Sequence, residues 1–96
     1  MTDLQCPATA VLLEDQVLPP PWLKRLPVAA SFESPEPGTV DALVEDSADL
    51  FRGETFVVRA PLAELTEMLR RRGLAGAIPA ILEVDSEGWR RIPLPC

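Results

Sequence analysis

The clearest pattern of hydrophobic and polar positions lies in APLAELTEMLRRRG, residues 60–73. Its apolar side chains recur at steps of three and four residues, the spacing of one helix face, at Leu62, Leu65, Met68 and Leu69. Pro61 suits the first helical position, and Gly73 suits the left-handed cap after the last turn. We therefore predict an amphipathic helix that buries this stripe, with a Glu67–Arg71 pair supporting another face.

Shorter β-favouring runs flank this helix. ETFVVRA, residues 54–60, precedes it, and IPAILEVDSEGWRRIPL, residues 78–94, follows it. The second run predicts two strands around a turn at residues 85–88, with Ile81 on one face and Leu82 on the other. The C-terminal half is thus predicted as strand, helix and hairpin.

The N-terminal half has a less regular pattern. ATAVLLEDQVL, residues 8–18, predicts a strand that ends where three prolines begin, and PVAASF, residues 27–32, predicts a second, short strand. TVDALVEDSADLFRG, residues 39–53, fits either of two structures. As a helix it has Thr39 as N-cap, stops at Gly53 and presents a broad apolar face, formed by Val40, Leu43, Val44, Leu50 and Phe51. As a strand it alternates apolar and polar positions and turns at EDSAD; we favour the helix.

Together these elements predict an α+β fold, or a small α/β fold, with a mixed β-sheet of about four to five strands. Two helices pack on the sheet, and the chain ends in a β-hairpin. At 96 residues the chain is long enough for one such domain, residues 1–96.

The order of the C-terminal half resembles the second half of a thioredoxin-like domain. The matching stretches are TFVVRA, PLAELTEMLRRRG and AIPAILEVDSEGWRR, which lie within residues 55–91, and Pro79 stands where that family has its cis-proline. The active-site CxxC of the family is absent, and Cys6 has no neighbouring cysteine. The resemblance therefore implies a fold that is used for binding and not for redox chemistry.

A proline-rich segment, VLPPPWLKRLPVAASF, residues 17–32, interrupts the pattern. It lacks the PxxP spacing of a ligand for SH3-type domains. A free linker would not expose Trp22 beside so many apolar neighbours, which are Leu23, Leu26 and Val28. We predict a strap that runs extended over the sheet, with Trp22 packed down and Lys24 and Arg25 outward. An exposed Trp22 would instead mark a partner-binding site.

Negative charge is concentrated in an acidic segment, residues 33–54, where seven carboxylates face only Arg52 and leave a net charge of −6. They belong to Glu33, Glu36, Asp41, Glu45, Asp46, Asp49 and Glu54. In a helix, three of them would form a like-charge stripe at four-residue steps that a basic partner would relieve. We expect a protein partner with a basic surface, and neither nucleic acid nor membrane, because the field of this segment repels both. The predicted partner-binding residues are Trp22, Lys24, Arg25, Asp41, Glu45, Asp46 and Asp49; the alternative is an ordinary solubilising surface.

A second charge cluster is basic. Its members follow the predicted helix and return in the hairpin: Arg70, Arg71, Arg72, Arg90 and Arg91. If the hairpin packs beside the helix end, these side chains converge on a candidate anion-binding site. Complementation of the helix dipole is the other interpretation.

The residue types present restrict the chemistry. The chain has no histidine, which removes serine–histidine and cysteine–histidine pairs and the usual histidine-containing zinc sites. Its two cysteines, Cys6 and Cys96, are either free thiols or a single bridge in an oxidising compartment. Carboxylates at four-residue steps would suit Ca²⁺ or Mg²⁺, but no EF-hand spacing is present. We expect no metal and no cofactor.

Composition and hydropathy indicate the class of protein and its cellular compartment. With 47% apolar and 25% charged residues the chain has the balance of a globular protein. It contains no run of about 20 apolar residues and no visible secretory signal, so we expect a soluble cytoplasmic protein. The scarcity of lysine, asparagine and tyrosine favours a GC-rich bacterial source.

These observations favour a small non-catalytic accessory protein that binds a partner through the acidic segment and the strap. Three alternatives remain open: a thioredoxin-like binding fold, an acidic inhibitor or nucleic-acid mimic, and an enzyme that uses carboxylates and arginines. The enzyme is the least supported, because no pair of side chains can be identified as general acid and base.

Overall fold

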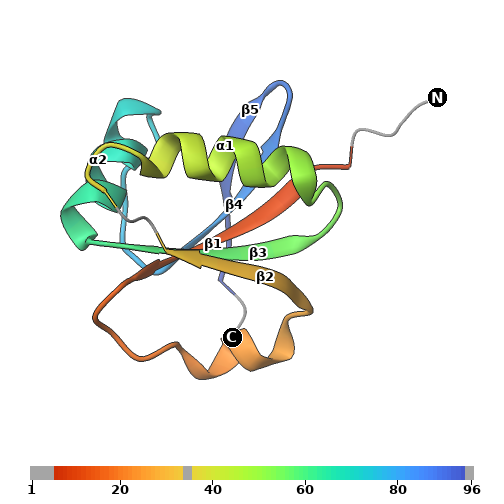
Figure 1. Cartoon of the computed structure of the whole chain (residues 1–96), viewed down its shortest axis with the longest axis horizontal. Coiled ribbons are helices and arrows are strands. Elements are labelled where there is room, and N and C mark those ends of the chain that lie inside the picture. The colour runs from red at the N-terminus through yellow and green to blue at the C-terminus, as the bar shows by residue number, and fades with distance from the viewer. Residues whose placement is uncertain (1–5, 34–35, 95–96) are drawn as a thin grey trace.

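The computed structural model describes residues 6–33 and 36–94. Its centre is a mixed five-stranded sheet of order β2-β3-β1-β4-β5 (Figure 1). The strands are β1 (Ala8–Glu14), β2 (Val28–Glu33), β3 (Thr55–Ala60), β4 (Ala80–Asp85) and β5 (Gly88–Ile92). β2, β3 and β1 run parallel, whereas β4 is antiparallel to β1 and to β5. The predicted α+β fold with a mixed sheet and a final hairpin is confirmed.

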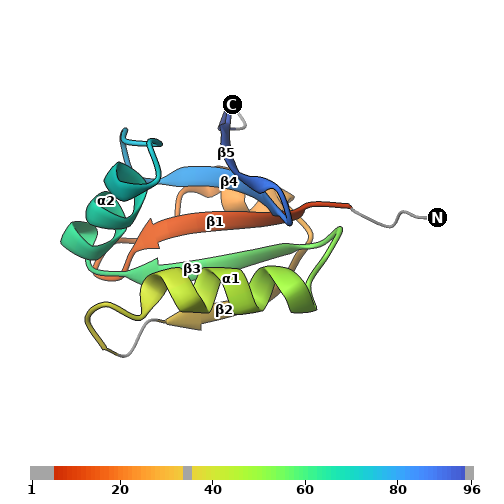
Figure 2. The same cartoon turned by 90° about the horizontal axis from the view of Figure 1, so that it is seen from above.

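Both helices, α1 (Val40–Leu50) and α2 (Leu62–Arg71), cover the same face of the sheet (Figure 1). Seen from above, α1 runs along β3, and α2 stands at the end of the sheet to which β1 and β3 point (Figure 2). The helix favoured for residues 39–53 is thus confirmed, and it spans Val40–Leu50. The predicted stripe of α2 closes the core, with no exposure at Leu65, Met68 or Leu69.

Helix α1 differs from the prediction in its N-cap and in one position of its buried face. The Thr39 side chain makes no capping bond, because its hydroxyl donates to the carbonyl oxygen of Glu36. Leu50 is 75% exposed, and Ala48 is buried in its place. At about 100° per residue, Leu50 lies roughly 80° around the helix from Val40, on the side away from Ala48 and the sheet.

Element ends also differ. Pro61 is the N-cap of α2 and not its first helical residue, so Leu62 lies at the rim of the stripe and is 45% exposed. β1 ends at Glu14 instead of reaching the prolines, because residues 15–17 turn away from the sheet. The Asp15 amide still donates to the carbonyl oxygen of Ala60, which fixes the start of this turn.

Among the described residues, it is the strap that covers the other face of the sheet. The strap was predicted to be extended, but its central part forms a single 3₁₀ helix, η1 (Pro21–Arg25). Its last residues form β2 (Figure 1). Proline fixes φ near −65°, which both the extended and the 3₁₀ conformation share, so the prolines alone do not decide between them. Under η1 lies a small apolar cluster formed by Val11, Leu13, Val57 and Ile81. Ile81 therefore faces the strap and Leu82 faces the helices, as predicted.

The loop before β4 is held by the hairpin. Arg91 donates to the carbonyl oxygens of Leu74 (3.1 Å) and Ala77 (2.9 Å). A Cβ at Gly76 would lie 2.9 Å from the guanidinium carbon of Arg91, so a larger residue there would push the end of this side chain aside. The Ile78–Pro79 bond that follows is cis, as the resemblance to thioredoxin-like domains implied for Pro79.

Candidate functional site

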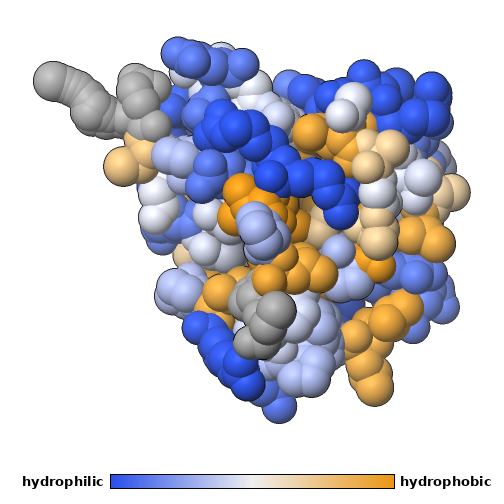
Figure 3. Space-filling model, turned by 180° about the vertical axis from the view of Figure 1, so that it is seen from behind, coloured by the Kyte–Doolittle hydropathy of each residue, from blue (hydrophilic) through white to orange (hydrophobic). Residues whose placement is uncertain are grey.

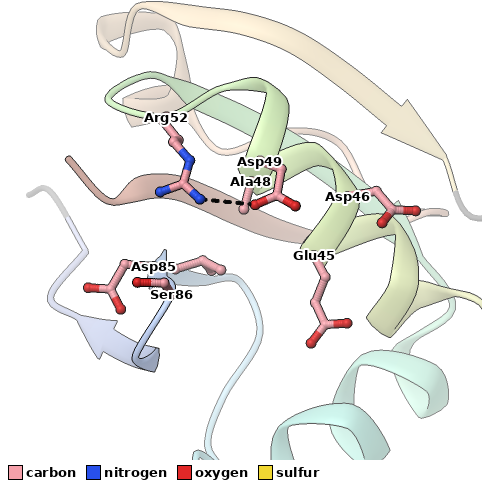
Figure 4. A pocket seen from close by; sticks show the side chains of 8 residues that line it. Glu45, Asp46, Ala48, Asp49, Arg52, Asp85 and Ser86 are labelled. Carbon is pink, nitrogen blue, oxygen red and sulfur yellow. Dashed lines mark hydrogen bonds and ion pairs between the residues drawn. The ribbon is translucent and has the colours of Figure 1, made fainter. Parts of the chain in front are cut away.

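The acidic segment borders a hollow of about 340 Å³ between α1 and the β4–β5 turn (Figure 4). We call it the acidic hollow, and its polar lining consists of Glu45, Asp46, Asp49, Arg52, Asp85 and Ser86. Glu45 and Asp46 are adjacent in α1, Asp49 lies about one turn further along, and the hairpin brings its turn opposite them. Four carboxylates therefore surround a space that contains one arginine.

The carboxylates of the acidic hollow differ in their bonding. The Asp49 carboxylate lies 3.3 Å from the Arg52 guanidinium, as the dashed line in Figure 4 shows. Asp85 accepts the amide hydrogen of Glu87 (2.8 Å), which lowers the pKa of its carboxyl, and Gly88 and Arg90 lower it further. Asp46 has neither a hydrogen bond nor an ion pair within the described part of the chain. It is the carboxylate most available to a partner.

Two predicted clusters meet at the other end of α1. The Asp41 carboxylate lies 2.8 Å from the Arg71 guanidinium and 3.3 Å from that of Arg72. Arg72 also pairs with Glu45 at 3.0 Å and lies over the Trp89 ring, 3.5 Å from its centroid. The like-charge stripe of α1 is therefore relieved inside the molecule. Sequence reasoning missed this pairing, although opposite charges on two predicted helices were the signal that could have found it.

The remaining arginines of the candidate anion site also have partners. Arg70 pairs with Glu67, and this bond lowers the pKa of the Glu67 carboxyl and raises that of the guanidinium. Arg90 bridges Glu83 and Asp85, which raises its own pKa. An anion at these arginines, or at Arg91 with its two carbonyl partners, would have to displace existing bonds. The anion site stays a prediction.

The strap residues are divided between the interior and the surface. Trp22 is partly buried against the small apolar cluster, whereas Lys24 and Arg25 are exposed, in the orientation that we predicted. Beside η1 lies a hollow of about 450 Å³ whose apolar floor and basic rim are formed by Leu13, Leu23, Leu26, Val57, Lys24 and Arg59.

A smaller hollow of about 190 Å³ continues this space and shares Leu13 and Pro20 with it. Its other lining includes Glu14, Val17, Leu18, Ile78 and Pro79. We call the two together the strap groove. The sequence predicted Val17 and Leu18 both as the end of the strand of residues 8–18 and as the start of the strap, and neither was named as a binding residue.

Other expected features concern metals, thiols and membranes. Within residues 6–33 and 36–94, no group of three or more cysteine, aspartate or glutamate side chains is placed to hold a metal ion. Cys6 is exposed, and Cys96 lies outside the described residues, so the predicted alternatives for the two thiols stay open. In the same part of the chain, no helix has the length and apolar character needed to cross a membrane.

No protein-family model, curated protein sequence or solved structure matches this chain. Its function is therefore argued from its own two surfaces, the acidic hollow and the strap groove. They lie on opposite sides of the sheet, because α1 covers one face and η1 the other (Figure 1).

Proposed function

We propose that this protein is a non-catalytic accessory protein that binds a basic protein partner at the acidic hollow. The observation that supports the proposal is the lining of that hollow, which has four carboxylates and one arginine, although Glu45 and Asp85 also pair with arginines outside the lining. A volume of about 340 Å³ falls within the roughly 300–1,000 Å³ range of ligand pockets. A lysine or arginine side chain of a partner fits this charge.

The carboxylates of α1 divide into two roles under this proposal. Asp41 and Glu45 are engaged by the arginines of α2 and hold the two helices together. Asp46 has no internal partner within the described residues, and Asp49 has only the exposed Arg52. A basic partner therefore gains its attraction chiefly from Asp46 and Asp49. Such charges raise the association rate, and salt weakens their effect.

The experiment uses cross-linking of the whole protein in a lysate of its source, followed by identification of the captured protein and kinetic measurement with it. We expect the variant Asp46→Asn/Asp49→Asn to slow association about tenfold at low salt, with a smaller effect at high salt. Its free energy of unfolding should change by less than about 1 kcal/mol, because exposed charges contribute little to stability.

A matched control neutralises two exposed carboxylates that do not line the acidic hollow, in the variant Asp15→Asn/Glu87→Gln. It changes the net charge equally and should leave the association rate within about twofold of wild type. Equal effects of the two variants would assign the attraction to net charge. A captured partner whose binding ignores both variants and salt would overturn the proposal.

A further inference from the structure

The strap covers its face of the sheet incompletely. Four of the described residues are buried in the cluster under it. The strap side chains that pack on this cluster are partly buried, and they are those of Trp22, Leu23, Leu26 and Val28. At the start of the strap, Leu18 is 88% exposed and Val17 is 53% exposed, and both line the strap groove. Figure 3 shows hydrophobic surface gathering toward this lower side of the molecule. Apolar side chains in water next to an apolar hollow are typical of a binding surface.

The charge of the strap groove is opposite to that of the protein. The chain has a net charge of −6, yet residues 17–32 contain Lys24 and Arg25 and no carboxylate. Lys24 lines the groove and has neither a hydrogen bond nor an ion pair within the described residues. Arg59, on the same rim, donates to the carbonyl oxygen of Val17 at 3.2 Å, which leaves its charge without a carboxylate. The groove thus has a positive end.

The smaller hollow of the groove is apolar, apart from Glu14. Val17, Leu18 and Ile78 line it, and Glu14 disfavours a second carboxylate there. The complementary ligand therefore has apolar side chains along its length and a carboxylate at the Lys24 end. In an extended peptide, alternate side chains point to the same side, so one apolar row can meet the floor while acidic neighbours reach the rim.

We propose that the strap groove binds an extended, acidic and apolar peptide segment of a protein partner. Apolar side chains of the segment lie on the floor around Leu13, and a carboxylate pairs with Lys24 and Arg59. This site is separate from the acidic hollow, on the other face of the sheet, and it selects the opposite charge.

The test measures fluorescence anisotropy of two labelled, end-capped probe peptides, one of alternating leucine and glutamate and one of alternating leucine and lysine. A length of about ten residues, roughly 33 Å when extended, crosses a molecule whose extents are 41 × 28 × 23 Å. The net charge of the protein is negative, so attraction by net charge alone would favour the lysine probe. Tighter binding of the glutamate probe is therefore the expected result, and it supports a local basic site.

Two variants localise the binding. Lys24→Glu reverses the charge on the rim, and we expect it to weaken the glutamate probe about tenfold. Arg25→Glu is the matched control, since it makes the same change on the same 3₁₀ helix at a residue that does not line the groove. We expect it to change the affinity by less than about threefold. Leu18→Glu, at an 88% exposed position, should weaken binding while the melting temperature stays unchanged.

Several results would overturn the proposal. The first is that the glutamate probe does not bind. The second is that Lys24→Glu and Arg25→Glu lose equal affinity for it. The third is that dodecanoate displaces the probe at concentrations far below those of unlabelled peptide, which would assign the groove to a fatty acid. Tighter binding of the lysine probe, abolished in Asp46→Asn/Asp49→Asn, would also overturn it while supporting the function proposed for the acidic hollow. Loss of the glutamate probe in that double variant would contradict the location on the strap face.

Discussion

The two faces of the sheet are closed in different ways. On the helix face, α1 and α2 bury fifteen of the described residues in one cluster, and several large side chains have no exposure at all. On the strap face, a single 3₁₀ turn leaves four buried residues under partly buried neighbours. Close packing stabilises one face, whereas the other retains a groove that a ligand can fill. The helix face thus supplies most of the buried core, and the strap face keeps an apolar groove.

The two sides also differ in charge. On the helix side, Asp41 and Glu45 are paired with arginines across the helix–helix contact, and Asp46 is the unpaired carboxylate of α1 among the described residues. On the strap side, Lys24 and Arg59 have no carboxylate partner among the described residues. Charges that are satisfied within the fold support the structure, and charges that are not satisfied are available to a partner.

The largest effect is expected for Leu65→Ala on the helix face. Leu65 is fully buried, and truncation of a buried leucine leaves a cavity that costs about 2–5 kcal/mol. The free energy of unfolding from urea denaturation measures this loss. Leu26→Ala in the strap is the comparison, and we expect it to lose less than half as much. Equal losses would mean that the two faces are packed equally well.

Trp22→Ala is expected to have an intermediate effect, about 1–3 kcal/mol, because Trp22 is only partly buried over the strap-side cluster. Urea denaturation again gives the value, and probe anisotropy tests whether the strap groove survives. A loss as large as that of Leu65→Ala would make the strap a second core layer. A change near zero, with weaker peptide binding, would make Trp22 an interface residue.

The helix face was the more predictable of the two, for a physical reason. The burial of Leu65, Met68 and Leu69 follows from a local repeat, which a short window of sequence contains. The alternation of Ile81 and Leu82 is equally local. The central place of β1, between β3 and β4, depends instead on contacts between distant segments, and no local pattern specifies it.

The candidate sites were less predictable. Both partners of the Asp41–Arg72 pair were identified, but thirty residues separate them along the chain, and only the packing of α1 on α2 brings them together. The strap was recognised by its composition, while its conformation depends on how Trp22 packs. The groove beside the strap could be predicted only if the end of β1 were known. The apolar residues Val17 and Leu18 were predicted to continue this strand, so the sequence did not indicate the turn after Glu14.

A smaller effect is expected for Arg72→Met, which sharpens the comparison of charges. Arg72 pairs with Asp41 and Glu45 and stacks on Trp89, so its loss should cost about 1–2 kcal/mol. Arg70→Met removes one exposed pair within α2 and is the matched control, with a clearly smaller expected loss than Arg72→Met. Urea denaturation at low salt measures both. Equal losses would deny any special role to the contact between the helices.

The smallest effect concerns the pH dependence of stability at the hairpin turn. The Glu87 amide, and then Arg90 and Gly88, hold the pKa of Asp85 below its ordinary value of 3.8. The unfolded chain therefore binds a proton at a higher pH than the folded protein does. The stabilisation by this group is complete above the unfolded pKa, and it is lost as the pH falls through the lower, folded pKa.

Asp85→Asn removes this titration. The melting temperature of the variant should lie below that of wild type at pH 7, and the difference should shrink as the pH falls from about 5 toward about 2. A repeat in 1 M salt separates the two kinds of cause, because salt screens the attraction of Arg90 but leaves the backbone hydrogen bond in place. Since the Glu87 amide is the largest single cause, part of the difference should survive the salt. A difference that is independent of pH would show that these interactions do not favour the ionised form of Asp85 in the folded protein. A difference that vanishes in salt would assign the lowered pKa to Arg90 instead of the Glu87 amide.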